Sequence, residues 1–194
     1  MNYPHSIPLW RTNGELLPGN ALSRVVLSSV CTKWNDIVLE QHHFPSRELT
    51  DVMFKWHVIV INIGHSVTEF EKDGQFQGGQ RARGAVTFLP SHQPFSCQLK
   101  VVSGMSANFL YLALNPVLVG RVAEGLQLDA DRIKLTERRG IIDPTVRHIA
   151  LALWARVQSD GALDRMYGEA LSTALAVHLL REYGAAVVGA KRQF

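Results

Sequence analysis

The spacing of apolar residues changes once along the chain, near residue 115, and this change limits the folds open to it. Before residue 115, apolar residues gather in short β-branched runs bounded by Gly, Pro and Asn, a pattern typical of strands. After residue 115 they recur every three or four positions, the spacing of one face of a helix. We therefore expect an α+β fold in which a β region precedes a helical region.

The β region is predicted over residues 25–114, after an N-terminal arm over residues 1–24. The strongest strand signal is the run His57–Ile63, and Asp73-Gly74 is a hairpin turn signal. About eight or nine short strands at such close spacing favour an all-β sandwich or barrel.

The helical region is predicted over residues 115–194. Asn115-Pro116 and Asp143-Pro144 each place an N-cap residue before a proline at the first helical position. The second helix is expected to end near Ser159, and the third to run from about Leu163 to Tyr183. The short connection between these two helices favours antiparallel packing.

The third predicted helix carries more apolar residues than one docking face requires. We therefore predict that it forms a homodimer contact through Leu171, Leu175, Val177 and Leu179. The alternative is that both apolar faces are buried within one copy, against the β region and the second helix.

Charge and composition exclude several classes of protein. The chain has 20 Lys+Arg and 17 Asp+Glu, and neither the first 120 residues nor the rest carries the basic excess of a nucleic-acid binder. No apolar stretch approaches the roughly 18 residues that a membrane-spanning helix needs. Two cysteines cannot form a disulfide framework. We expect a cytoplasmic protein with no membrane partner.

Motifs for catalysis and metal binding are missing from the sequence. Its eight histidines include no His-x-His or HExxH pair, and no GxSxG or phosphate-binding glycine loop occurs. His42 and His43 are neighbours on a predicted strand, so they point to opposite faces and cannot both serve one inward site. We predict no metal, no cofactor and no catalytic residue.

The spacing of His57, Gly64, Gly84 and Pro90 resembles the two motifs of the cupin fold, a double-stranded β-helix or jelly-roll barrel. The ligand chemistry departs from the family. His57 stands where cupins have a metal-binding Glu, and Phe95 stands where the second motif has a His. The resemblance therefore implies a barrel with an organic ligand pocket and without a metal site.

In that register, side chains two apart on a strand share the inward face of the barrel. We predict that the ligand is bound by His57, Ile59, Phe88, Phe95 and Tyr111. A largely apolar wall with few polar groups is typical of a small-molecule site. The alternative is that these residues are ordinary core side chains and that His57 is a buried histidine with its hydrogen bonds satisfied.

A cupin-like barrel followed by about three helices, two of them in a hairpin, resembles the N-terminal half of AraC/XylS-family bacterial transcriptional regulators. The segments that carry this resemblance are Asp36–His43 with Pro45, His57–Val60, Gly84–Pro90, Leu112–Pro116, Asp143–Val146 and Glu169–Tyr183.

In such regulators the barrel senses a small molecule, the helices support dimerisation, and a C-terminal helix-turn-helix domain binds DNA. The resemblance implies an effector-sensing domain, which is not an enzyme and which reaches DNA only through that absent C-terminal domain. Two alternatives stay open: a small cupin-type enzyme, either an isomerase or a dioxygenase, and a barrel that serves only as a scaffold.

Overall fold

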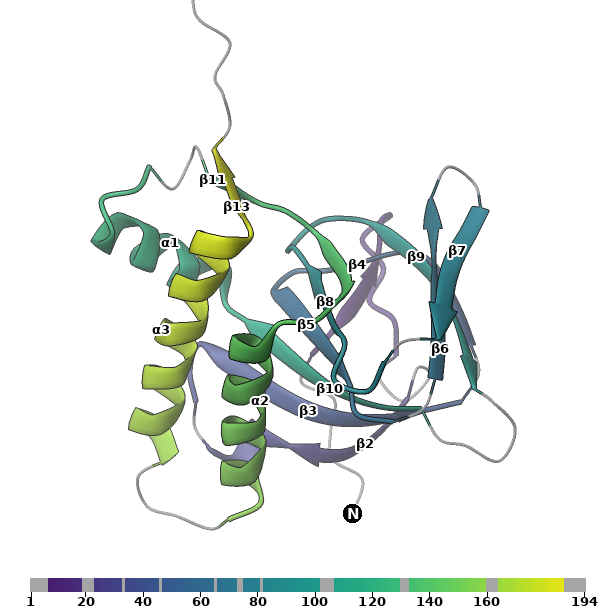
Figure 1. Cartoon of the computed structure of the whole chain (residues 1–194), viewed down its shortest axis with the longest axis horizontal. Coiled ribbons are helices and arrows are strands. Elements are labelled where there is room, and N and C mark those ends of the chain that lie inside the picture. The colour runs from purple at the N-terminus through teal and green to yellow at the C-terminus, as the bar shows by residue number, and fades with distance from the viewer. Residues whose placement is uncertain are drawn as a thin grey trace, which may run out of the picture.

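The fold is a sandwich of two antiparallel sheets with helices on one side (Figure 1). The computed structural model describes residues 7–18, 23–32, 34–45, 47–64, 66–72, 75–80, 82–101, 107–129, 133–159 and 164–186. The predicted turn at Asp73-Gly74 lies outside these residues.

Strands of the two main sheets alternate along most of the chain. The six-stranded sheet has the order β12 (Arg138–Ile141), β8 (Val86–Leu89), β5 (His57–Asn62), β10 (Ala107–Leu114), β3 (Ile37–Phe44), β2 (Arg24–Ser28). The five-stranded sheet has the order β1 (Leu9–Arg11), β4 (Arg47–Phe54), β9 (Phe95–Val101), β6 (Ser66–Lys72), β7 (Gln75–Gln80). From β3 to β10 each connection changes sheet except the β6–β7 hairpin. The predicted β-sandwich is confirmed, and closure into a barrel stays a prediction.

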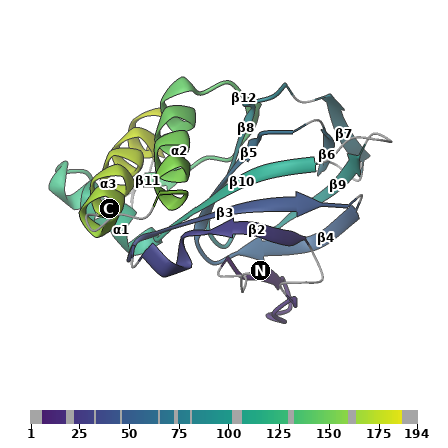
Figure 2. The same ribbon diagram turned by 90° about the horizontal axis from the view of Figure 1, so that it is seen from below.

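Three helices follow, and two of the predicted starts are confirmed by their caps. Asn115 accepts a hydrogen bond from the Val117 amide (3.0 Å), and Asp143 accepts one from the Val146 amide (2.9 Å). The helices are α1 (Pro116–Gly125), α2 (Pro144–Val157) and α3 (Asp164–Glu182). Figure 2 shows α2 and α3 side by side. Within the described ranges, no helix combines the length and hydropathy that crossing a bilayer requires.

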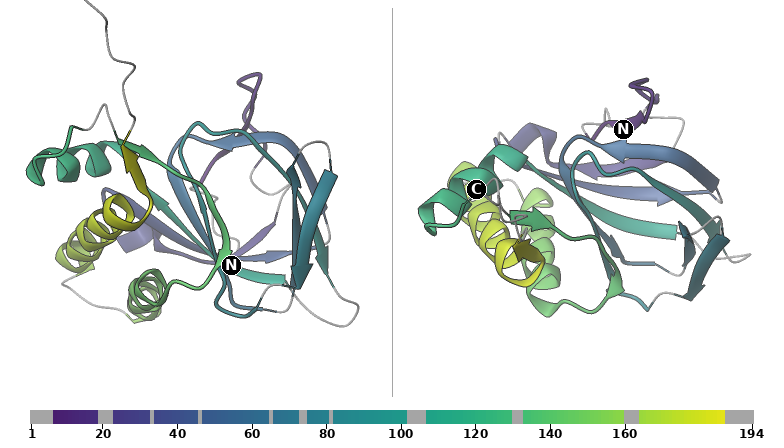
Figure 3. Two further views of the ribbon diagram at one scale, coloured as in Figure 1. Left: turned by 45° about the horizontal axis from the view of Figure 1, so that its top comes forward. Right: turned by 90° about the horizontal axis from the view of Figure 1, so that it is seen from above.

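Both faces of the six-stranded sheet are buried, each against a different partner (Figure 3). Alternate residues of its central strands pack under the helices, among them Ile59 of β5 and Leu112 of β10. Their neighbours Val58 and Ala113 face the five-stranded sheet. We call these two layers the helix-side core and the inter-sheet core.

Short strands also form outside the predicted β region. β12, from the predicted helical region, pairs with β8 at one edge of the six-stranded sheet, and β1, from the predicted arm, pairs with β4. A small sheet joins β11 (Ile133–Leu135) to β13 (Gly184–Ala186), and a 3₁₀ helix (Ser29–Thr32) follows β2. Strands of three or four residues are too short to show an alternation that can be recognised in the sequence.

The predicted dimer contact needs a correction at two of its four residues. Leu175 and Leu179 have no exposed surface, because they belong to the helix-side core, where the strands and the other helices surround them. They cannot contact a second copy in this conformation. Leu171 and Val177 are only partly buried. The wide apolar arc of α3 is thus largely used within one chain.

We predict that Gly168→Ala destabilises the fold although alanine is the better helix former. A Cβ at Gly168 in α3 would stand 2.5 Å from two atoms of the Trp34 indole, which is buried and has little room to move. Overpacking of this kind costs roughly 1–3 kcal/mol. The measurement is the free energy of unfolding from denaturant titration.

Gly120→Ala in α1 is the matched control, because nothing lies within 4 Å of its added Cβ. That substitution should stabilise the protein by up to about 1 kcal/mol through helix propensity. Equal effects of the two substitutions would contradict the packing of Gly168 on Trp34.

Candidate functional site

A buried polar pair lies between the two sheets. Glu40 and His42 are two apart on β3, so their side chains share the face that looks toward the five-stranded sheet. Their exposed fractions are 0% and 5%. The Nε2 atom of His42 lies 2.9 Å from a carboxyl oxygen of Glu40.

Two serines complete this pair, Ser23 just before the neighbouring strand β2 and Ser28 at its end. The Ser23 hydroxyl lies 2.6 Å from Nδ1 of His42, and the Ser28 hydroxyl lies 3.5 Å from the second carboxyl oxygen of Glu40. These distances fit the tautomer in which Ser23 donates to Nδ1 and Nε2 donates to Glu40. Burying a carboxyl group is costly unless it is paired, so this arrangement has a physical reason to persist.

Aromatic rings surround the pair. The ring of Tyr111 lies 4.6 Å from that of His42, and Phe44 lies 5.8 Å from Tyr111. From the opposite sheet, Phe54 lies 6.5 Å from Tyr111 and stacks on Phe95 at 5.6 Å. Such rings offer a flat apolar wall beside a few polar groups, the usual character of a small-molecule site.

Tyr111 is the member of this cluster that keeps accessible surface. It faces the inter-sheet core yet is only partly buried, as are Val38 and Val60 beside it. The Tyr111 hydroxyl has no hydrogen-bond partner in the part of the chain that the structure describes, and burial raises the pKa of Tyr111, which keeps the hydroxyl protonated. We call Glu40, His42, Phe44 and Tyr111 the inter-sheet site.

The five predicted ligand residues do not come together. Phe95 and Tyr111 lie in or beside the inter-sheet core. Ile59 and Phe88 lie in the helix-side core, with the Phe88 ring 5.3 Å from that of Tyr183. The expectation that His57 and Ile59 point inward with Phe95 is therefore wrong. The alternation along β5 is confirmed, since His57 and Ile59 share one face. That face packs under the helices and not against the five-stranded sheet.

His57 is buried at the start of β5, on the face that the helices cover. Its Nδ1 accepts a hydrogen bond from the Ser91 amide (3.0 Å), and its ring lies 6.0 Å from that of Phe88. Burial, with a smaller contribution from His92, lowers the pKa of His57 from 6.5 to about 4. A neutral ring is required, because Nδ1 must keep a free lone pair to accept this hydrogen bond.

The Glu40–His42 pair was missed in the sequence. The divergence of His42 and His43 is confirmed, since His42 bonds inward to Ser23 while His43 lies 3.2 Å from Asn108 on the other face. A signal for the pair was available, because Glu40 stands two residues before His42 in a largely apolar predicted strand. This spacing places both side chains on one face. Among the described residues, no group of three or more His, Cys, Asp or Glu side chains is arranged to hold a metal ion.

A second constellation joins α2 to α3. One oxygen of Asp143 accepts hydrogen bonds from His178 Nε2 and from the Tyr183 hydroxyl, both at 2.7 Å. Burial alone would raise the pKa of Asp143, but these bonds and that from the Val146 amide lower it overall. With its cap on α2, the group has a clear structural role.

No family model matches the sequence, and no curated protein matches it. Among solved structures, the chain is similar to apo ToxT of Vibrio cholerae, an AraC-family regulator, with a TM-score of 0.56 and 9% identity. The alignment covers 82% of this chain and 61% of the ToxT chain, which is less than two thirds of its length. The likeness shows that the chain shares its fold with this part of ToxT.

Other solved structures resemble the chain more distantly. A cupin domain from Bordetella pertussis covers 48% of this chain with 92% of its own, at 11% identity and a TM-score of 0.35. Hazelnut (Corylus avellana) vicilin covers 48% of this chain with 28% of its own, at 7% identity and a TM-score of 0.37. Likenesses this low carry no inference.

We predict that His42→Ala destabilises the fold by roughly 1–3 kcal/mol, because it leaves the buried Glu40 carboxyl without its imidazole donor. The exposed neighbour on the same strand supplies the control. His43→Ala should change the free energy of unfolding by no more than about 0.5 kcal/mol. Equal losses in denaturant titration would mean that the pair contributes nothing beyond strand packing.

We predict a stability loss at mildly acidic pH that His57 causes. Its pKa is about 4 in the folded chain and 6.5 when exposed, so between these values the unfolded chain binds the extra proton. Stability should therefore fall as the pH drops through this window, by up to about 3 kcal/mol.

His57→Asn keeps an acceptor for the Ser91 amide but cannot titrate, so it should remove this pH dependence. The control is His148→Asn, an exposed position on α2. The measurement is the free energy of unfolding of both variants and of the unsubstituted chain from pH 4 to pH 7. A slope that survives in His57→Asn would show that another group causes it.

Proposed function

We propose that the chain is the effector-sensing part of an AraC-type transcriptional regulator and binds a small organic molecule at the inter-sheet site. The observation that carries the proposal is Tyr111, which is only partly buried and whose hydroxyl has no partner among the described residues. It stands between aromatic rings and the Glu40–His42 pair. The fold shared with ToxT supports the regulatory setting.

The chemistry of the inter-sheet site favours a ligand with a flat apolar body and one hydrogen-bonding group. Phe44, Phe54 and Tyr111 supply ring faces and edges for that body. The Tyr111 hydroxyl can donate to the ligand's polar group or accept from it. A ligand with many hydroxyl groups, such as a sugar, would leave most of them unpaired here, at a high cost.

In this proposal DNA is bound by a separate helix-turn-helix domain, in agreement with the small and evenly spread charge of the chain. Such a regulator acts in the cytoplasm, where bacterial DNA lies. We also keep the homodimer as a proposal, now resting on Leu171 and Val177, since both retain accessible surface on α3. Light scattering that finds only monomer at high protein concentration would contradict the homodimer proposal.

A second candidate is a small enzyme that moves a proton within its substrate. The observation in its favour is the imidazole–carboxyl pair of His42 and Glu40 beside the Tyr111 hydroxyl, groups that general acid–base catalysis uses. The two candidates differ in what becomes of the bound compound, because a sensor releases it unchanged and an enzyme converts it.

We predict that Tyr111→Phe lowers the affinity for a bound compound about three- to tenfold, which corresponds to the loss of one neutral hydrogen bond. The compound is the strongest hit of a thermal-shift screen of small aromatic and aliphatic molecules. Stability without compound should hardly change, since the hydroxyl has no partner to lose among the described residues. Tyr167→Phe on α3, an exposed tyrosine, is the control and should leave affinity unchanged.

Isothermal titration gives the affinities, and mass spectrometry of the recovered compound separates the candidates. Unchanged compound supports the sensor, whereas conversion supports the enzyme. Equal affinity of Tyr111→Phe and the unsubstituted chain would remove the inter-sheet site from the proposal. A broad screen without a hit would favour a scaffold role.

A further inference from the structure

A separate pocket lies on the other face of the six-stranded sheet, between α2 and the turn that leads into β8. Its volume is about 420 Å³. Its floor is formed by Ile61 and Leu110, its wall by Leu151 and Trp154 of α2, and its rim by Arg83 and Arg147. We call it the α2 pocket. It shares no residue with the inter-sheet site.

The lining of the α2 pocket is mixed. Ile63, Leu151 and Trp154 are partly buried and give it accessible apolar surface, while Gln41, Asn62 and Asn108 add uncharged polar groups. Ile61 and Leu110 lie beneath, with exposed fractions of 2% and 0%. The Trp154 indole N–H donates to the side-chain oxygen of Gln41 on β3, at 3.2 Å. This bond fixes the ring, which presents a flat surface to whatever enters the pocket.

The rim of the α2 pocket carries two positive charges and no negative one. Arg83 and Arg147 have neither an ion pair nor a hydrogen bond to any described residue, and no Asp or Glu occurs among the described lining residues. Two guanidinium groups without counter-charges at one concave site attract anions. Their planar donor pairs match a carboxylate, which they can bind bidentately.

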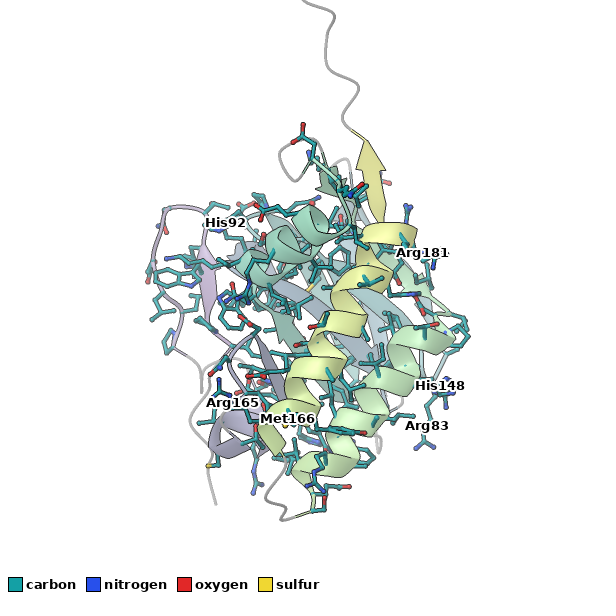
Figure 4. All side chains as sticks on the ribbon, turned by 90° about the vertical axis from the view of Figure 1, so that its left-hand side faces the viewer. Arg83, His92, His148, Arg165, Met166 and Arg181 are labelled. Carbon is teal, nitrogen blue, oxygen red and sulfur yellow. The ribbon has the colours of Figure 1, made fainter. Side chains whose placement is uncertain are left out.

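Arg147 is positioned by the turn itself. Gly84 has a φ of +87°, and a Cβ there would stand 3.4 Å from three atoms of the Arg147 guanidinium. The charged group therefore packs against a glycine backbone that the Gly84 amide ties to the carbonyl of Asn62 (2.7 Å). In Figure 4 the Arg83 side chain extends outward beside α2, as His148 does.

We propose that the α2 pocket binds a small organic carboxylate with an apolar body. The carboxylate lies on Arg83 and Arg147, and the body lies on Leu151 and Ile63 against the Trp154 ring. A plain inorganic anion would satisfy the arginines but leave this apolar surface open, which favours the organic acid. This site stands apart from the proposed function and does not depend on it.

The test uses the full chain and three probes: benzoate, its uncharged analogue benzamide, and inorganic phosphate. Amide and indole resonances are followed by two-dimensional NMR at low salt, about 50 mM, where screening is weak. Benzoate should shift the Arg83, Gly84 and Trp154 indole resonances with a dissociation constant of no more than about 10 mM, as expected of a small fragment. Benzamide and phosphate should each bind at least about tenfold more weakly.

Substitution of the arginines provides the second arm. Arg147→Gln and Arg83→Gln should each weaken benzoate about tenfold, the value of a charge-assisted hydrogen bond. Arg156→Gln is the matched control, because Arg156 lies on the same helix but outside the pocket, and should leave the affinity unchanged. Dispersed spectra confirm that each variant is folded.

Several outcomes would overturn the proposal. Benzamide binding as tightly as benzoate would remove the role of the arginines, and phosphate binding as tightly would reduce the site to an anion patch. Shifts confined to Tyr111 and its neighbours would place benzoate in the inter-sheet site. No shift up to about 10 mM, or variants that bind like the unsubstituted chain, would exclude the α2 pocket as a carboxylate site.

Discussion

Burial of the six-stranded sheet on both faces is the constraint on which the rest of the structure depends. Its central strands are largely apolar on both faces, because one set of side chains packs under the helices and the other against the second sheet. Burial of apolar side chains on each face stabilises the fold by about 25 cal/mol for each Å² of apolar surface removed from water. The helices and the five-stranded sheet are held to the molecule through this one layer.

Burial on both faces also explains which features of the fold could be predicted from the sequence and which could not. Helix starts were predictable because Asn115-Pro116 and Asp143-Pro144 are local signals whose bonds lie within a few residues. Alternation in β5 correctly grouped His57 with Ile59. It could not say which layer that group would face, because a strand that is apolar on both sides reads the same in either orientation. The pairing of the two layers depends on segments far away in the chain.

Two other features were beyond the sequence for different reasons. Edge strands such as β1 and β12 have only three and four residues, too few to show a recognisable alternation of side chains. The surroundings of the buried Glu40–His42 pair include Ser28 of β2, which bonds to Glu40, and Ser23 just before β2, which bonds to His42; both serines meet the pair only once β2 and β3 pair. A carboxyl group within an apolar strand is a signal that can be sought in other sequences of this kind.

The two proposed sites lie on opposite faces of the six-stranded sheet and are formed by the same strands. On β3, Glu40 and His42 look toward the inter-sheet site, while Gln41 between them holds the Trp154 ring of the α2 pocket. On β10, Tyr111 and Leu110 divide in the same way. The sheet is thus the common wall of two chemically different surroundings, one aromatic with a neutral hydroxyl and one of mixed lining with a cationic rim.

The Asp143 carboxylate has a consequence for how the helices open. It caps the first turn of α2 and accepts both hydrogen bonds that arrive from the end of α3. If α3 unwinds at its C-terminal end, α2 loses part of the surroundings that hold its cap in place. The two helices should therefore exchange their amide hydrogens with solvent as one cooperative unit and not one after the other.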